Sequence, residues 1–343
     1  MQNSILTVSK HSEFFIALCQ RGQHSSIMLG VNHESQPELL GIIGKSNFID
    51  PDFNNTCKIV KKTLTSNTLA VLNDANLTSK GKQAKLISYQ AYAINYAQLQ
   101  EFLSLIAYIE INQIQDNIIG TSKSNNELIK CYVPDESKDN IDNPNIKFTY
   151  RTLPNLLANA TDYSDFNVQD ICNKSKFLNI NNTCRHTSLD ILRTILGFKT
   201  DISENFLIKP AYKTTRLAGV LNKETFCILP HPPGAFKDLS DHQLDVLTKL
   251  YRRIQEIPKK DCFSAKTKAK FDALKATYVA IAGKNNLSAG DLLITIWDEI
   301  NTNSKRCEDL FARRNTNFFS KFITGASATE KMFMEINTKL NKC

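Results

Sequence analysis

The chain has 343 residues, of which 42% are hydrophobic and 22% charged, and its formal net charge at pH 7 is +8. This length and composition fit a globular protein with one large domain or two ordinary ones, and no apolar run of about 18 residues predicts a membrane span. No glycine-rich phosphate loop and no basic-aromatic stripe accompany the basic excess, so we predict a solvated surface and no nucleic-acid partner.

The N-terminal part has the pattern of β-strands with short turns. An apolar segment at 14–18 fits a strand or a short helix, and two further strands follow at 24–30 and 39–45. We expect a long polar loop, 31–38, between these two strands. His24 starts the first of them, where one side of a strand packs on the core and the other can line a cleft.

A strand and a helix are predicted next. Residues 86–94 alternate as a strand does, after one short apolar element at 69–72. A helix should begin after Asn95, because Asn95 and Gln98 have the spacing of a capping box and apolar residues recur beyond them at helical spacing. We expect the apolar face of this helix to pack on the core.

The segment 112–180 has no sustained pattern. One strand is predicted at 128–133, while Pro154 and the Asp and Asn residues of 162–173 indicate turns. We interpret the segment as an irregular insertion that shapes one wall of a site.

Cys184 stands where a helix should begin. Asn182 or Thr183 can cap the first turn, apolar residues follow at helical spacing, and Gly197 ends the helix. The unpaired N–H groups and the dipole of a helix start favour a thiolate over a thiol, and a thiolate is nucleophilic.

The C-terminal part is predicted to be helical. A proline-rich stretch at 230–234 cannot continue a helix and precedes the helical region. Asp238 or Ser240 should cap the first helix, and Pro258 should end it. The expected helices span residues 243–257, 267–282, 288–300, 305–323 and 328–341.

The nine cysteines are odd in number, are scattered and include no C-x-x-C. We interpret them as reduced thiols of a cytosolic protein, and we predict neither a metal site nor a cofactor. His24 is the candidate partner for Cys184, as thiolate with imidazolium, because a nucleophilic cysteine needs a base to carry protons.

Two short motifs carry a resemblance. The segment 24–30, His-Ser-Ser-Ile-Met-Leu-Gly, resembles the H-x-x-I-x-L-G strand of circularly permuted papain-like enzymes, the group of the lecithin:retinol acyltransferase and NlpC-like families. Residues 182–186, Asn-Thr-Cys-Arg-His, are similar to their N-C-x-H motif with one residue inserted. The resemblance covers about 200 residues, and the order of His before Cys also matches.

The resemblance implies an α+β fold with an antiparallel sheet and a nucleophile helix. Cys184 would be the nucleophile and His24 the general base, both within a papain-like catalytic domain, 1–205, that is followed by a linker and an α-helical domain, 206–343. The strand that should carry a third polar residue is apolar or Gly over 39–44, so the orienting group is unassigned.

Several other residues have weaker candidate roles. His33, in the predicted loop, is an alternative orienting group, and for His186 we favour a structural hydrogen bond over catalysis. The backbone N–H of Cys184 is the first candidate for an oxyanion donor. Side-chain alternatives for that donor are Gln23, Asn182 and Tyr89, while His231 and His242 are predicted to lie at the surface.

Two hypotheses for the function follow. The first is a cysteine-dependent acyl-transfer enzyme, meaning a peptidase, deamidase, transglutaminase-like enzyme or acyltransferase, with a thioester on Cys184. The second is a non-catalytic protein with a degenerate core and a helical module that binds a partner protein or an anionic membrane. The apolar strand without a third catalytic residue favours the second hypothesis, whereas the presence of both His24 and Cys184 favours the first.

The composition and domain order also resemble type IV secreted effectors of intracellular bacteria such as Legionella. That resemblance implies a host protein or lipid as substrate, peripheral contact with an anionic membrane, and a cytoplasmic protein delivered into the host cell. The first 30 residues lack the features of a Sec signal, which fits that route.

Overall fold

The computed structural model divides into two compact units, Met1–Pro210 with Thr215–Lys223, and Ala211–Thr214 with Glu224–Cys343. The residues that it describes are 5–33, 36–47, 67–74, 85–116, 128–135, 143–153, 166–217, 220–221, 225–301, 304–311 and 327–342.

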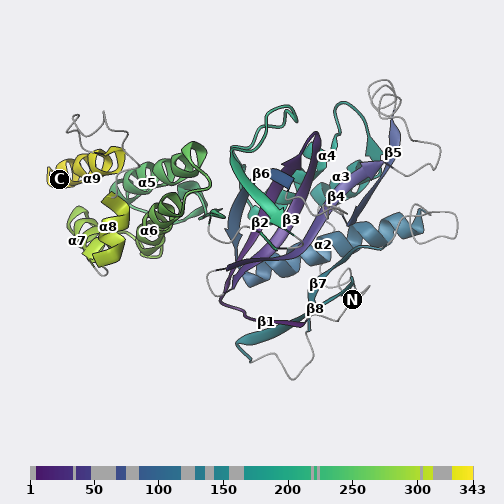
Figure 1. Ribbon diagram of the computed structural model, residues 1–343, viewed down its shortest axis with the longest axis horizontal. Helices are drawn as coiled ribbons and strands as arrows, with labels where there is room; N and C mark the ends of the chain where they lie inside the picture. Colours follow the sequence, from purple (N-terminus) through teal and green to yellow (C-terminus); the bar gives the residue numbers. More distant parts are fainter. Residues whose placement is uncertain are drawn as a thin grey trace. The chain divides into compact units, whose positions relative to one another are not determined.

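The first unit is built around an antiparallel sheet (Figure 1). Its strands follow the order β11-β10-β6-β2-β3-β4-β5-β9, and β11 also pairs with β4, so six of them close into a ring of paired strands. The fold class is therefore α+β, as predicted. The strands are β2 (Glu13–Arg21), β3 (His24–His33), β4 (Gln36–Asn47), β5 (Thr68–Asp74), β6 (Lys85–Ile94), β9 (Phe177–Leu178), β10 (Tyr212–Leu217) and β11 (Val220–Leu221).

Strand β2 is buried on both faces, which explains its unbroken apolar run. Phe14 to Leu18 are fully buried, and β2 pairs with β3 on one side and with β6 on the other. Close packing also fixes Gly30 on β3, because a Cβ atom there would lie 2.2 Å from the ring of Phe15. The turn from β2 to β3 uses Gly22, whose φ of 61° suits glycine.

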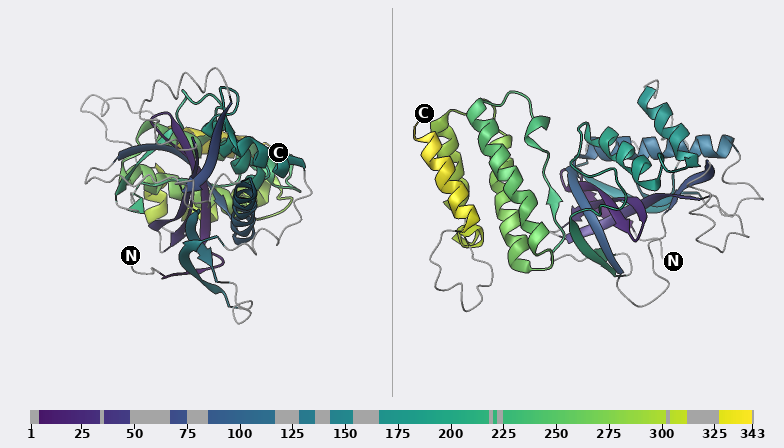
Figure 2. Two further views of the ribbon diagram at one scale, coloured as in Figure 1. Left: turned by 90° about the vertical axis from the view of Figure 1, so that its right-hand side faces the viewer. Right: turned by 90° about the horizontal axis from the view of Figure 1, so that it is seen from above.

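Three helices lie on one face of this sheet (Figure 2). They are α2 (Tyr96–Gln115), α3 (Phe166–Ser175) and α4 (Cys184–Leu196). The predicted capping box of α2 is confirmed: Asn95 Oδ1 accepts the N–H of Gln98, and Gln98 Oε1 accepts the N–H of Asn95. A separate small sheet has the order β1-β8-β7 and comprises β1 (Ile5–Ser9), β8 (Asn145–Thr152) and β7 (Lys130–Pro134).

The second unit is mainly helical over its described residues, as predicted. Large apolar side chains of α5 and α6 are buried and form its core, among them Leu250, Ile254 and Phe271. No helix in the described part of the chain is both long and apolar enough to span a membrane. The elements are β12 (Ile228–Leu229), the 3-10 turn η3 (Pro233–Ala235), α5 (Asp241–Lys260), α6 (Ala265–Ala282), α7 (Ala289–Asn301), α8 (Ser304–Phe311) and α9 (Ala328–Leu340).

The expected long loop at 31–38 was wrong. β3 continues to His33 and β4 begins at Gln36, so the described residues of this segment, 31–33 and 36–38, are strand residues. Asn32 shows why polar residues are tolerated there, because its Nδ2 donates to Glu13 Oε2 on the neighbouring strand at 3.2 Å.

The interpretation of 112–180 as irregular was also wrong in part. The segment contains β7, β8 and α3, although only a strand near β7 was expected. Helix α3 was missed because few of its residues are apolar. Its buried apolar side chains, Val168, Ile171 and Cys172, lie three and four positions apart and form one narrow stripe.

Pro258 does not end the first C-terminal helix. α5 continues to Lys260, and Pro258 lies in its last turn. The ring removes only one hydrogen-bond donor so near the end, and Pro258 is buried, which offsets that loss. The predicted cap at Ser240 is confirmed, since Ser240 Oγ accepts the N–H of Gln243 at 3.2 Å.

Candidate functional site

Cys184 is the first residue of α4. Thr183 occupies the N-cap position, and Gly197, with a φ of 70°, ends the helix as predicted. Leu189 and Leu192 are fully buried, and α4 contacts β2, β3 and β4. The apolar face of α4 therefore sets its first turn against the sheet.

The sulfur of Cys184 lies against the start of β3. It accepts the backbone N–H of Ser25, 159 positions earlier in the chain, at 3.3 Å. Its own S–H points to the carbonyl oxygen of Gln23 at 3.9 Å. These contacts come from both neighbours of His24, so the fold brings Cys184 to the strand end where His24 lies.

The electrostatics correct the expected thiolate–imidazolium pair. Burial raises the pKa of the Cys184 thiol, although the N–H of Ser25 and the charge of Lys45 act in the opposite direction. Burial also lowers the pKa of His24. Both shifts favour neutral forms, and among the described contacts no hydrogen bond joins the Cys184 sulfur to the His24 ring. The Cys184 thiol and the His24 imidazole are therefore each favoured in the neutral form.

A buried cation that the sequence analysis missed lies beneath this helix start. Lys45, directly after the apolar stretch of β4, is only 1% exposed. Its Nζ donates to the carbonyl oxygen and to Oδ1 of Asn182 at 3.1 and 2.9 Å. It also donates to Thr187 Oγ1 at 3.1 Å and to the carbonyl oxygen of Lys174 at 2.7 Å.

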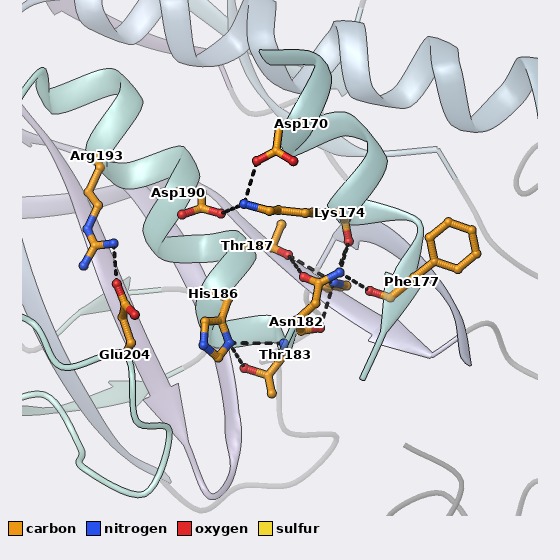
Figure 3. Close-up of polar contacts among 11 residues, drawn as sticks. Asp170, Lys174, Phe177, Asn182, Thr183, His186, Thr187, Asp190, Arg193 and Glu204 are labelled. Atoms are coloured by element: carbon orange, nitrogen blue, oxygen red, sulfur yellow. Dashed lines mark hydrogen bonds and ion pairs between the residues drawn. The ribbon is translucent and has the colours of Figure 1, made fainter. Parts of the chain in front are cut away.

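Asn182 connects the end of α3 to the start of α4 (Figure 3). Its Nδ2 donates to the carbonyl oxygens of Lys174 and Phe177, both at 2.8 Å. Because its amide hydrogens are used in this turn and its Oδ1 accepts from Lys45, Asn182 is not placed as an oxyanion donor. Its role is to hold the turn that delivers Cys184.

A second buried cation, Arg185, follows Cys184. Its side chain has no exposed surface, and its Nε and Nη2 donate to the carbonyl oxygens of Ser203 and Ile208 at 2.9 and 2.5 Å. Its Nη1 donates to Gln20 Oε1 at 3.2 Å, and Gln20 pairs with Ser25 across β2 and β3. Arg185 thus ties the segment 203–208 to the strand pair beside Cys184.

His186 takes the structural position that we favoured. Its Nδ1 lies 2.9 Å from Thr183 Oγ1 and accepts the N–H of Thr183 at 3.3 Å, so the ring closes the first turn of α4 (Figure 3). Further along, Lys174 forms ion pairs with Asp170 and Asp190. The contacts of His186 with Thr183 stabilise the start of α4. Among the described hydrogen bonds, none joins the His186 ring to the sulfur of Cys184.

The remaining candidates are scattered. Gln23 is exposed in the turn before β3, whereas Tyr89 is fully buried in β6. The side chain of His33 lies outside the described residues. His231 and His242, predicted at the surface, are half-buried in the second unit.

The site thus belongs to an α+β protein with a buried helix-start thiol beside a histidine-bearing strand. The described cysteines, which exclude Cys57 and Cys343, are all free thiols. Within the described ranges, no group of three or more His, Cys, Asp or Glu side chains could hold a metal ion. No protein family, curated protein or solved structure matches the chain.

Proposed function

We propose that the protein is a cysteine-dependent acyl-transfer enzyme in which Cys184 is the nucleophile and His24 the base. The observation that carries this proposal is the position of the Cys184 sulfur, at a helix start and 3.3 Å from the N–H of Ser25, the residue next to His24. Nucleophile and base must meet in space, and the backbone contacts of the sulfur with Gln23 and Ser25, on either side of His24, support this pairing.

The reaction begins from the neutral pair. The thiol proton passes to the His24 imidazole while the sulfur attacks the acyl carbon of an ester or amide. The bond to the leaving group then breaks, the imidazolium returns the proton to the departing oxygen or nitrogen, and a thioester on Cys184 results. Water, an amine or an alcohol attacks the thioester with His24 again as base, and the thiol is regenerated.

The lowered pKa of His24 is consistent with this sequence. A base must be unprotonated, and burial keeps the imidazole neutral at neutral pH. The backbone N–H groups at the start of α4 favour negative charge at the sulfur, and they can also stabilise an oxyanion. The resting thiol is thus protected by burial and ionises as it attacks.

A circularly permuted papain-like core is part of the same proposal. Two features support it: the antiparallel sheet, and a helix that begins with the cysteine and packs on the strand that begins with the histidine. Delivery of the protein into a host cell, with a host protein or lipid as its substrate, stays a prediction.

A non-catalytic binding protein is the second candidate. Two observations favour it: the raised pKa of Cys184, and exposed apolar side chains on α7, where Ile294 and Trp297 are 61% and 46% exposed. In that case the helical unit would recognise a partner and the thiol would be a core residue.

The test uses p-nitrophenyl acetate as a generic acyl donor for the full chain. Wild-type protein should release p-nitrophenolate, and Cys184→Ala and His24→Ala should each abolish the protein-dependent rate. Cys227→Ala is the matched control, because Cys227 is a buried thiol outside the site. Circular dichroism checks folding. An unchanged rate in folded Cys184→Ala would overturn the enzyme proposal and leave the binding protein.

A further inference from the structure

The side chain of Lys45, on β4, binds the segment that forms the first turn of α4, and it has no part in the reaction described above. Its four oxygen acceptors come from Lys174, at the end of α3, and from Asn182 and Thr187, which lie on either side of Cys184 in the chain. The ammonium group has three hydrogens to donate and no accepting atom, so a cage of oxygen atoms favours its charged form. A buried lysine without such acceptors would be costly.

We propose that Lys45 is a positioning residue that sets the pH range over which Cys184 is reactive. It holds the turn that places the sulfur beside β3, and its positive charge favours the thiolate. This inference rests on the proposed function, because it assigns a role in the reactivity of the same thiol.

Charged groups around Lys45 influence whether its amine is protonated, which supports a role for Lys45 in the pH dependence of Cys184. Cys184 and Asp190 of α4 favour its charged form, and Lys174 of α3 opposes it. Lys174 is itself paired with Asp170 and Asp190. Among the described residues, other titratable groups near this helix start are His24 on β3, Arg185 and His186 on α4, and Glu204, which acts on His186.

The direction of the pH effect follows from these shifts. Burial lowers the pKa of Lys45 to about 7. Below that pH the ammonium is charged and holds the pKa of the Cys184 thiol down; above it the charge is lost and the thiol becomes harder to ionise. Ionisation of Cys184 in the wild-type protein should therefore extend over a wider pH range than a single independent group gives.

The experiment measures the alkylation rate of Cys184 by iodoacetamide between pH 5.5 and about 10, with peptide mapping to isolate that residue. In Lys45→Met, which keeps the length of the side chain and removes the charge, the apparent thiol pKa should rise and the rate at pH 7 should fall at least about tenfold. The dependence of the alkylation rate on pH should also become narrower in Lys45→Met and match the titration of a single independent group.

Lys176→Met is the matched control. Lys176 is a mostly buried lysine in the same unit, but its partner is Asp116. This variant should leave the Cys184 profile within about twofold of wild type. A Lys45→Met profile equal to wild type in folded protein would overturn the inference.

The wild-type profile decides the matter if Lys45→Met does not fold. A broad profile supports the inference, and a single-group profile overturns it. Alkylation needs no substrate, so the result is independent of turnover. If Lys45→Met does not change the alkylation profile of Cys184 but Cys184-dependent acylation occurs, only this inference is refuted. If Lys45→Met changes that profile but no acylation occurs, only the proposed function is refuted.

Discussion

Each unit of the chain contains a buried cysteine, and the two differ in what surrounds the sulfur. Cys227, in the second unit, is 1% exposed, and its described hydrogen bond goes from Sγ to the carbonyl oxygen of Thr225 at 3.5 Å. Burial raises the pKa of Cys227 to about 12. Cys184 is also buried, but a backbone N–H points at its sulfur and the Lys45 cation lies nearby.

This contrast shows that burial alone does not define the site. A thiol that donates to a carbonyl oxygen and is strongly desolvated is held in its protonated form and behaves as a small core residue. A thiol that accepts an N–H, lies at a helix start and has a cation nearby has groups ready for negative charge. The first unit provides these groups for Cys184, and this difference is the basis for proposing Cys184, and not Cys227, as the nucleophile.

The largest effect should come from removing the base. His24→Gln should lower the rate of acylation of Cys184 by about 10²- to 10⁴-fold, the usual contribution of a general base. Burst kinetics with p-nitrophenyl acetate measure this rate. A His24→Gln rate within about threefold of wild type would show that another group accepts the proton.

The same residue should set the acid limit of acylation. Since burial lowers the pKa of His24, the neutral base persists below the ordinary histidine pKa of about 6.5, and the wild-type rate should fall only at lower pH. This acid limb should disappear in His24→Gln. A midpoint clearly above 6.5 would contradict the assigned environment of His24.

The two cysteines should also differ in reactivity. Cys184 should be alkylated by iodoacetamide at least about tenfold faster than Cys227 at pH 8, because a backbone N–H donates to the Cys184 sulfur, whereas burial raises the pKa of Cys227 to about 12. Quantitative peptide mapping of the folded protein gives both rates. Equal rates, or faster labelling of Cys227, would remove the distinction between the two sites.

Arg185 should matter for stability. Arg185→Met should lower the free energy of unfolding by about 2 to 4 kcal/mol, because it leaves Gln20 Oε1 and two carbonyl oxygens without their buried donor. Arg253→Met is the control in the second unit, since Arg253 pairs with a half-exposed Glu256 and donates to one hydroxyl, that of Thr329, and it should cost less, about 1 kcal/mol.

Urea unfolding followed by circular dichroism measures both variants. The fluorescence of Trp297, the single tryptophan of the chain, reports on the second unit. A similar decrease in the free energy of unfolding in the two variants would show that the buried hydrogen bonds of Arg185 do not stabilise the first unit more than the contacts of Arg253 stabilise the second.

The smallest effect is expected at a helix cap. Ser240→Ala should destabilise the second unit by about 1 kcal/mol, because the N–H of Gln243 loses the side-chain oxygen that accepts it. The transition of Trp297 fluorescence in urea measures this change. An unchanged midpoint would show that the cap is replaced by another acceptor.

Features set by neighbours in the chain were predictable. The cap at Asn95, the cap at Ser240 and the stop at Gly197 depend on residues within four positions, and all three are confirmed. The strands at 86–94 and 128–133 were also recognisable from short patterns. The position of the helix start at Cys184 came from the same local rules.

Features set by distant residues were not predictable. The sequence gives no sign that Lys45, the last residue of the predicted strand 39–45, is buried, because its acceptors at Asn182 and Thr187 lie 137 and 142 positions later. Arg185 next to the cysteine gave no sign of complete burial, since its partners are on β2 and in 203–208. The pKa of Cys184 was expected to fall because the dipole was considered without the burial that outweighs it.

The most direct measurement for the central claim is the location of the acyl group. Wild-type protein is acylated with p-nitrophenyl acetate, quenched in acid and mapped by peptide mass spectrometry, with and without hydroxylamine, which cleaves thioesters. We predict one acetyl group, on Cys184, that hydroxylamine removes, and none on Cys227. Acetylation spread over lysines and other cysteines, with Cys184 unmodified, would contradict the assignment of Cys184 as the nucleophile.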